Sequence, residues 1–301
     1  MLWSRAVPKA LFASLLLFLA RAAGAQEPRD YDPASTAWNG LSTLVDLARA
    51  EGVTLEPVEV VQFQSLRPGD GLFIVYPESP LPDSDILRFL AAGGRVAIAD
   101  DFGTAAPLLE RLRIHRSDGP PPSEDTLHGN RELPIARPRA AHPLTDGVDS
   151  LVTNHATYLA STGETPVEPA FDFGSPERAA VIAGAVGDTR TGRIAILSDP
   201  SVLINNMLEH PGNRRFARNL LTYLGAGGGR VVLAHGEFAS IGTFGTPPPL
   251  ASPDIIPAFN AFLRDLASAT PPGHVVRLLA LLAVCATFFV ITLAVPITGH
   301  R

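Results

Sequence analysis

The sequence predicts an α/β domain with a largely parallel sheet flanked by helices, followed by one C-terminal transmembrane helix. Four short apolar runs bounded by turn residues alternate with segments of helical period, which is typical of parallel strands joined by crossover helices. Residues 278–295 carry no charge and are long enough to cross a hydrocarbon core. Residues 10–20 form a shorter apolar run after a basic start and before small residues, as in a secretory signal.

The predicted domain opens with a helix and two strands. Residues 37–50 place leucine and valine at helical spacing, and Gly52 ends this helix. The valine-rich residues 53–61 predict a strand. Residues 71–76, with the sequence GLFIVY, predict a buried strand that ends before Pro77.

Two helices and a strand follow in the predicted order. Residues 82–92 predict a helix that ends at two glycines, residues 95–99 a buried strand, and residues 104–112 a second helix. Three successive prolines mark residues 117–123 as a loop. Short strands, at an edge of the sheet or in an inserted hairpin, are predicted at residues 133–136 and 150–153.

The last third of the domain continues the alternation. Residues 179–186 and 193–197 predict either a hairpin or two neighbouring strands. Residues 199–209 and 214–224 predict two helices separated by a Pro-Gly pair. Residues 230–234 predict the last buried strand.

These segments together predict an exported protein tethered by its C-terminus. Small residues before Gln26 predict signal cleavage at that point. Lys9 is the only lysine, a bias typical of a GC-rich bacterial genome, so we expect a single-pass protein of the bacterial inner membrane with most of the chain in the periplasm. The predicted boundaries are a signal peptide at 1–25, an exported α/β domain at 26–238, a Pro-rich linker at 239–253, a juxtamembrane amphipathic helix at 254–272, a transmembrane helix at 273–297 and a cytoplasmic tail at 298–301.

Composition and motifs exclude several classes of function. The formal net charge is −6, and the predicted signal contains only basic charges, so the exported domain is more acidic still and poorly suited to nucleic acid. The single cysteine, Cys285, lies in the predicted span, which leaves the domain without a disulfide or a thiol nucleophile. No phosphate-binding glycine loop, G-x-S-x-G motif or H-E-x-x-H motif is present, so we expect no cofactor, no metal and no catalytic residue.

Polar residues follow each of the four predicted buried strands. Because parallel strands end at one edge of a sheet, where α/β proteins bind their ligands, we expect these side chains to face a shared candidate ligand-binding site. Converging carboxylates with a histidine could bind a cation or hold sugar hydroxyls. The residues are Glu78, Asp100, Asp101, Asp199, His235 and Glu237.

Other interpretations of the same residues compete with a shared site. Asp199 and the Asp100–Asp101 pair stand at strand-to-helix turns, where aspartate is an ordinary N-cap that stabilises by ~1 kcal/mol. His235 and Glu237 are two residues apart, so they would share one face of a continued strand and could bind a metal. The eight histidines are scattered, however, and no serine near a strand end has a neighbouring histidine, which disfavours both a metal site and a nucleophile.

Several segments of the sequence resemble DUF4350 domains. Residues 199–224, DPSVLINNMLEHPGNRRFARNLLTYL, are similar to the C-terminal part of these domains, where an Asp, an Asn-rich helix and a G-N-x-x-x-A-x-N-L-L pattern recur. Residues 31–52 resemble the opening of the family, and residues 71–99 its strand–helix–Gly-Gly–strand block. The positions that fit the pattern are Gly212, Asn213, Ala217, Asn219, Leu220 and Leu221.

The resemblance implies a flavodoxin-like sheet related to class I glutamine amidotransferases. Residues 142–148, HPLTDGV, are similar to a motif of those folds, and residues 235–238 are a local version of an acidic, histidine-containing segment found before a membrane helix in many members. In amidotransferases a cysteine occupies a strand-to-helix elbow. The equivalent residues here, 100–103, contain no cysteine, so the resemblance implies the fold without that activity.

The sequence favours a non-catalytic, membrane-anchored periplasmic domain that binds an envelope protein partner or a small ligand at the carboxyl edge of its sheet. One alternative is a hydrolase of envelope glycans, which would pair Asp100 or Asp101 with Glu78, Asp199 or Glu237 at a separation of ~5–9.5 Å. Another alternative is an accessory subunit of an envelope transport or assembly complex, in which the membrane helix itself makes contacts.

Overall fold

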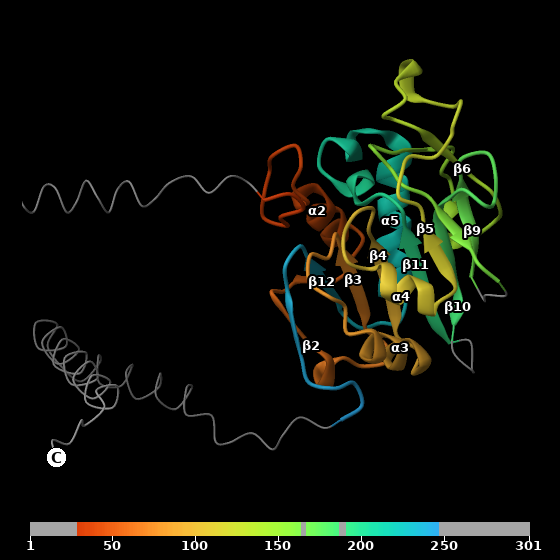
Figure 1. Cartoon of the computed structure of the whole chain (residues 1–301). Coiled ribbons are helices and arrows are strands. Elements are labelled where there is room, and N and C mark those ends of the chain that lie inside the picture. Colours follow the sequence, from red (N-terminus) through yellow and green to blue (C-terminus); the bar gives the residue numbers. More distant parts are fainter. Residues whose placement is uncertain (1–28, 164–166, 187–190, 247–301) are drawn as a thin grey trace, which may run out of the picture. The chain divides into compact units, whose positions relative to one another are not determined.

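The computed structural model describes residues 29–163, 167–186 and 191–246 (Figure 1). The chain divides into two units, residues 1–247 and 248–301, and every described residue belongs to the first. Its centre is an eleven-stranded mixed sheet with helices on both faces.

One half of the sheet is parallel and contains the four predicted buried strands. They lie side by side, with β3 between β12 and β4, and β11 on the far side of β4. The short strand β1 pairs in parallel with the other edge of β12. These strands are β1 (Leu55–Pro57), β12 (Val231–His235), β3 (Gly71–Val75), β4 (Arg95–Ala99) and β11 (Gly192–Leu197).

The other half of the sheet is antiparallel, so the prediction of a largely parallel, flavodoxin-like sheet is wrong. Strand β10 pairs antiparallel with β11, β9 and β8, and the pairs β9–β6, β6–β7 and β5–β8 are antiparallel too. The connection between β10 and β11 is too short for a crossover helix, and such a connection forces antiparallel pairing. The strands of this half are β5 (Ile114–Arg116), β6 (Ile135–Pro138), β7 (Leu151–Val152), β8 (Leu159–Ser161), β9 (Val167–Asp172) and β10 (Ala179–Val186).

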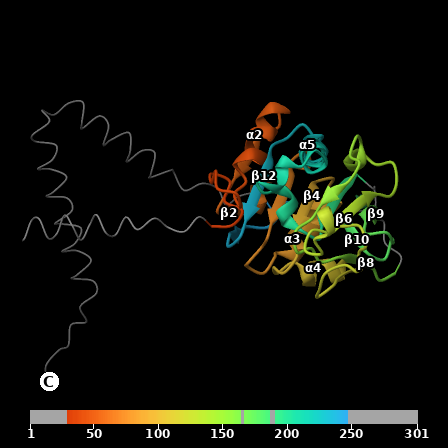
Figure 2. The same ribbon diagram turned by 90° about the horizontal axis from the view of Figure 1, so that it is seen from above.

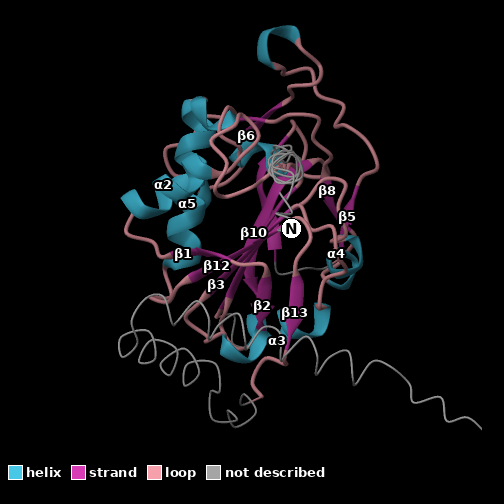
Figure 3. Cartoon of the chain, turned by 90° about the vertical axis from the view of Figure 1, so that its left-hand side faces the viewer, coloured by secondary structure: helices cyan, strands magenta, loops and turns pink. Residues whose placement is uncertain are grey.

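Four helices cover the sheet from two sides (Figures 2 and 3). Side chains of α2 (Ser42–Ala50) and α5 (Pro211–Gly225) pack with Phe73, Ala97 and other residues that alternate along the strands. Helices α3 (Asp83–Ala91) and α4 (Ala106–Arg111) pack on the opposite face with the intervening strand residues. Both faces of the parallel strands are therefore buried, which explains why these strands are continuous apolar runs in the sequence.

Several predicted elements differ in detail from the structure. The predicted strand 53–61 breaks into β1 and β2 (Val60–Gln62), and β2 pairs in a separate small sheet with β13 (Ala239–Ile241). The predicted helix 199–209 is instead two short 3-10 turns, Pro200–Leu203 and Met207–Glu209. Asn205 and Asn206 lie between these turns, and asparagine side chains compete with the helix for backbone groups.

The predicted membrane topology is also corrected by the structure. None of the helices in the described part of the chain is long and apolar enough to cross a membrane, so the expected single-pass inner-membrane protein is not supported. The residues on which that expectation depended, 1–25, 254–272 and 273–297, lie outside the described ranges.

The N-terminus of α5 is attached to β7 by one buried asparagine. Asn213 is fully buried; its Oδ1 accepts from the Val152 N–H at 2.9 Å, and its Nδ2 donates to the Val152 carbonyl at 2.8 Å. A Cβ on Gly212 would lie 1.9 Å from the Ser150 carbonyl oxygen, so only glycine permits this close approach. The G-N pair of the sequence motif is therefore a structural joint between helix and sheet.

We expect Asn213→Ala to lower the free energy of unfolding by about 2–4 kcal/mol, because both buried backbone groups of Val152 lose their partner. Urea denaturation of the full chain measures this difference. Asn130→Ala, which removes one exposed bond to the Glu132 N–H, is the matched control and should cost less than about 1 kcal/mol. Equal losses of unfolding free energy in the two variants would contradict the role of Asn213 in joining the helix to the sheet.

Candidate ligand-binding site

The carboxyl ends of β12, β3, β4 and β11 meet at one edge of the sheet. Five of the six predicted site residues follow these ends and His235 is the last residue of β12, but the structure does not gather the six into one cluster. Asp100 lies in a buried ion pair and Asp199 in a buried turn, Asp101 lines a small cavity, and the other three residues line an adjoining larger one.

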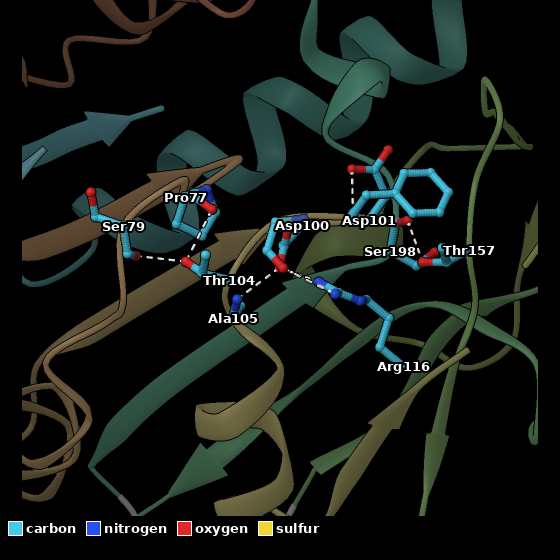
Figure 4. Close-up of polar contacts among 11 residues, drawn as sticks. Pro77, Ser79, Asp100, Asp101, Thr104, Ala105, Arg116, Thr157 and Ser198 are labelled. Atoms are coloured by element: carbon cyan, nitrogen blue, oxygen red, sulfur yellow. Dashed lines mark hydrogen bonds and ion pairs between the residues drawn. The ribbon is translucent and has the colours of Figure 1, made fainter. Parts of the chain in front are cut away.

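Asp100 holds the turn between β4 and α4 (Figure 4). One carboxylate oxygen accepts from the Gly103 N–H at 2.6 Å, and the other accepts from the Ala105 N–H at 3.0 Å and from the Arg116 guanidinium. Asp100 is completely buried, and Arg116, which lies on β5, is largely buried beside it. Burial raises the pKa of Asp100, and the Arg116 charge opposes this rise. These bonds make Asp100 a structural residue of the elbow.

Thr104 attaches the same turn to the segment that follows β3 (Figure 4). Its hydroxyl donates to the Ser79 carbonyl at 2.6 Å and lies 3.0 Å from the Pro77 carbonyl oxygen. The Thr104 N–H also donates to Pro77. The segments after β3 and β4 are therefore fixed relative to each other.

Asp199 is an N-cap, as one of the competing interpretations expected. Its carboxylate accepts from the Ser201 N–H at 2.7 Å and from the Asn154 N–H at 2.6 Å, and only 2% of the residue is exposed. Burial raises its pKa to about 7, against the effect of the Asn154 bond, and the nearby Asp101 charge adds to the rise. Asp199 thus joins the segment after β11 to the loop that carries Asn154.

Asp101 lines a cavity of about 270 Å³ that we call the aromatic cavity. One Asp101 oxygen accepts from the Phe102 N–H at 2.8 Å. Burial raises the pKa of Asp101 to about 6, against the effect of this bond. The other lining residues come from the loop before α2, the ends of β3, β4 and β11, and the loop after β7; they are Asp30, Tyr31, Trp38, Asn39, Tyr76, Phe102, Asn154, His155, Ser201 and Ile204.

Four aromatic side chains surround the aromatic cavity. The rings of Tyr31 and Tyr76 lie with their centroids 5.3 Å apart. Trp38 is 63% exposed and Phe102 is 56% exposed, and these are two of the four large apolar side chains exposed in the described part of the chain. Exposed aromatic residues beside a cavity are typical of a surface that contacts another molecule.

The backbone around the aromatic cavity is strained. Tyr31, Tyr76 and His155 have φ angles of 60°, 46° and 54°, and they are three of the five non-glycine residues with positive φ in the described ranges. The left-handed conformation costs an L-residue roughly 1–2 kcal/mol. Strained residues persist where the surroundings hold them, and they cluster at ligand sites. Their N–H groups are held at 2.8–2.9 Å by the carbonyl oxygens of Asn39, Ala99 and Glu132.

The larger cavity, of about 890 Å³, adjoins the aromatic cavity and shares Asp30 and Tyr76 with it. It brings together three of the predicted residues, Glu78, His235 and Glu237. Burial lowers the pKa of His235, so its neutral form is favoured. In the residues that the structure describes, no group of three or more His, Cys, Asp or Glu side chains is placed to hold a metal ion.

Sequence reasoning missed the aromatic half of the site. Tyr31 and Trp38 lie in a turn-rich segment, YDPASTAWNG, and Tyr76 is the residue directly after β3. A useful signal was present, because large aromatic residues are unusual among turn formers such as Asp, Pro, Ser, Asn and Gly.

The fold and site define a class of protein, a mixed α/β domain with two adjoining cavities at the carboxyl ends of its parallel strands. The family described as "Domain of unknown function (DUF4350)" matches residues 33–221, more than half of the chain. The chain belongs to the DUF4350 family. No curated protein sequence matches it.

Three solved structures resemble parts of the chain. The N-terminal domain of mmIFT52 has 13% identity and a TM-score of 0.42, covering 51% of this chain and 76% of that one. A β-galactosidase from Bacillus circulans sp. alkalophilus has 15% identity and a TM-score of 0.31, with 48% and 23% covered. A β-galactosidase from Rahnella sp. R3 has 14% identity and a TM-score of 0.33, with 52% and 22% covered. All three TM-scores are below 0.5, so these similarities do not establish a shared fold or function.

We expect Arg116→Met to lower the free energy of unfolding at neutral pH by about 3–5 kcal/mol, because it leaves the buried Asp100 carboxylate without its counter-charge. Arg49→Met, which breaks an exposed pair with Asp46, should cost less than about 1 kcal/mol. Urea denaturation compares them. The double variant Arg116→Met/Asp100→Asn should regain a large part of the loss; a double variant as unstable as the single one would contradict the charge argument.

We expect Asp101→Asn to stabilise the protein at pH 8 by about 1–3 kcal/mol and to have little effect at pH 4. Burial raises the folded-state pKa of Asp101, so the folded state binds this proton more tightly than the unfolded chain. The favourable contribution is complete below about pH 4 and is lost as the pH rises through about 6. Denaturation midpoints across this range test the difference, with the exposed Asp118→Asn as control. A constant difference between Asp101→Asn and wild type would contradict it.

Proposed function

We propose that this chain is a non-catalytic binding domain that holds a small ligand in the aromatic cavity. The observation that carries the proposal is the grouping of three left-handed, non-glycine residues around one cavity. Such strain reduces stability, and it is retained where it places side chains for another purpose. Here it places Tyr31, Tyr76 and His155 at the cavity wall.

The structural roles of the Asp100 and Asp199 carboxylates support a binding function over a catalytic one. Asp100 and Asp199 accept hydrogen bonds from backbone N–H groups, and neither is open to a substrate. The elbow at residues 100–103 carries Asp100 and contains no cysteine, so it has no thiol nucleophile. We therefore assign this elbow to the cavity wall, where Asp101 and Phe102 contact the ligand.

One observation favours the hydrolase alternative. Asp101 and Asp199 are neighbouring carboxyl groups whose pKa values are raised to about 6 and about 7, which resembles an acid–base pair. Glycoside hydrolysis requires both carboxyl groups to reach the substrate. Asp199 is 2% exposed and accepts two backbone hydrogen bonds, so only Asp101 is placed to act.

A fragment screen tests the proposed binding. Chemically diverse small molecules are added to the full chain, and two-dimensional NMR follows the backbone amides. We expect hits to shift the amides of Asn39, Tyr76 and Asp101, which line the aromatic cavity.

Asn154→Trp should abolish these shifts, because the indole side chain at this lining position would fill the cavity. The hydrogen bond from the backbone N–H of residue 154 to Asp199 does not depend on the side chain and is kept. Asp118→Trp, on an exposed loop, should leave them unchanged. Hits that all map elsewhere, or that bind Asn154→Trp equally well, would overturn the proposed function.

A further inference from the structure

We propose that the ligand of the aromatic cavity is an organic cation with N–H donors, an ammonium or guanidinium group. This inference rests on the proposed function and adds the chemical class of the ligand. Three independent features of the cavity wall support it: a buried acceptor without a partner, an excess of carboxylates, and the aromatic rings.

The buried acceptor is the side-chain oxygen of Asn39. Asn39 lines the cavity and is 8% exposed; its Nδ2 donates to Asp30 Oδ1 at 2.5 Å, while its Oδ1 is buried without a hydrogen-bond partner. The bond to the Asp30 carboxylate fixes which end of the amide is the donor. A buried acceptor without a partner destabilises the fold, so a ligand N–H that reached the Asn39 Oδ1 would offset this cost.

The charge of the wall favours a cation. Asp30 and Asp101 both line the cavity, and Asp199 lies close enough to Asp101 for the Asp101 charge to raise the pKa of Asp199. Among the described residues that line this cavity, none is arginine or lysine. Arginines line a different cavity, at the amino ends of β4 and β11 and along α5, which includes Arg95, Arg193, Arg215 and Arg218. A neutral ligand would leave the desolvated Asp101 carboxylate uncompensated.

The aromatic side chains suit the same class of ligand. Tyr31, Trp38, Tyr76 and Phe102 all line the cavity, and the face of an aromatic ring attracts a cation. Rings, carboxylates and a free acceptor together match a group that is both charged and rich in N–H donors. A quaternary ammonium matches the rings and the charge but offers nothing to Asn39.

Cation binding should be linked to pH through Asp101. A bound cation stabilises the ionised carboxylate, so affinity should fall as the pH drops below about 6 and Asp101 becomes protonated. The charged or titratable groups that interact with Asp101 are Asp100, Arg116, Asp199, Tyr31 and Tyr76, and Asp30 and His155 line the same cavity.

The cation can come from a free small molecule or from a lysine or arginine side chain of another protein. Both present the same chemistry to the cavity, whose volume of about 270 Å³ suits a short chain with its charged end. The experiment therefore includes a free amine and a lysine-containing peptide.

The test measures binding of simple probes to the full chain by NMR titration of the Asn39 and Asp101 amides. The probes are n-butylammonium, n-butylguanidinium, tetramethylammonium, n-butanol and methyl β-D-glucopyranoside. We expect the first two to bind about tenfold more tightly than n-butanol at pH 8, with tetramethylammonium between them and n-butanol. We expect this preference to shrink about tenfold between pH 8 and pH 5.

Asp101→Asn should weaken n-butylammonium binding about tenfold and remove its pH dependence, because the variant keeps the shape of the side chain without its charge. Asp118→Asn is the matched control and should bind as wild type does. An acetylated pentapeptide with a central lysine distinguishes the sources: tighter binding than n-butylammonium indicates a protein side chain, and absence of peptide binding indicates a free small molecule.

Two outcomes would overturn the inference. If the glucopyranoside or n-butanol binds at the cavity as tightly as the cations, the cavity is a ligand site but does not select for charge, and the proposed function survives. If none of the probes binds and the fragment screen also fails at this cavity, both the inference and the proposed function are wrong.

Discussion

The site depends on side chains from residues 199–219 that hydrogen-bond to the backbone of distant loops. Asn205 donates to the Ser35 and Ala37 carbonyls at 2.9 and 2.6 Å, and its Oδ1 accepts from the Thr43 N–H at 2.8 Å. Helix α2 has no side-chain cap of its own at its first turn, so Asn205 supplies this cap from another segment. The loop that carries Trp38 and Asn39 is thereby fixed to the segment that follows β11.

The same kind of interaction recurs along this segment. Asp199 holds the Asn154 N–H, Asn213 holds both backbone groups of Val152, and Asn219 donates to the Leu144 and Asp146 carbonyls. Loops have few backbone partners of their own, so buried amide and carboxylate groups must provide them. The polar residues of the motif by which the sequence resembles its family therefore fix loops, while Ala217, Leu220 and Leu221 pack in the core, so the motif does not itself indicate chemistry.

The sequence predicted the parallel strands well because their signal is local. Each of the four is an apolar run buried on both faces and bounded by turn residues, and the four pair in parallel with one another. In the antiparallel half the sequence also predicted β10, β6 and β7, but it missed β9 and the strands β5 and β8, which are three residues long and partly exposed. The carboxylates at the strand ends were predicted for the same local reason. Their separation into a buried ion pair, a cap and two cavities depends on Arg116 and Asn154, whose positions only the folded chain determines.

Two features of the aromatic cavity lower the stability of the folded protein. Left-handed backbone at Tyr31, Tyr76 and His155 reduces stability, and so does a buried Asp101 carboxylate whose pKa is raised to about 6. Asp100, by contrast, is a structural carboxylate whose charge is compensated. It accepts hydrogen bonds from two backbone N–H groups of its own turn and from the Arg116 guanidinium. Asp101, its neighbour in sequence, accepts a hydrogen bond from the Phe102 N–H and lines a cavity. Asn39, whose buried Oδ1 has no hydrogen-bond partner, lines the same cavity. Two adjacent aspartates at one strand end are thus stabilised to very different degrees, and the less stabilised one lies where a bound molecule can supply what the protein does not.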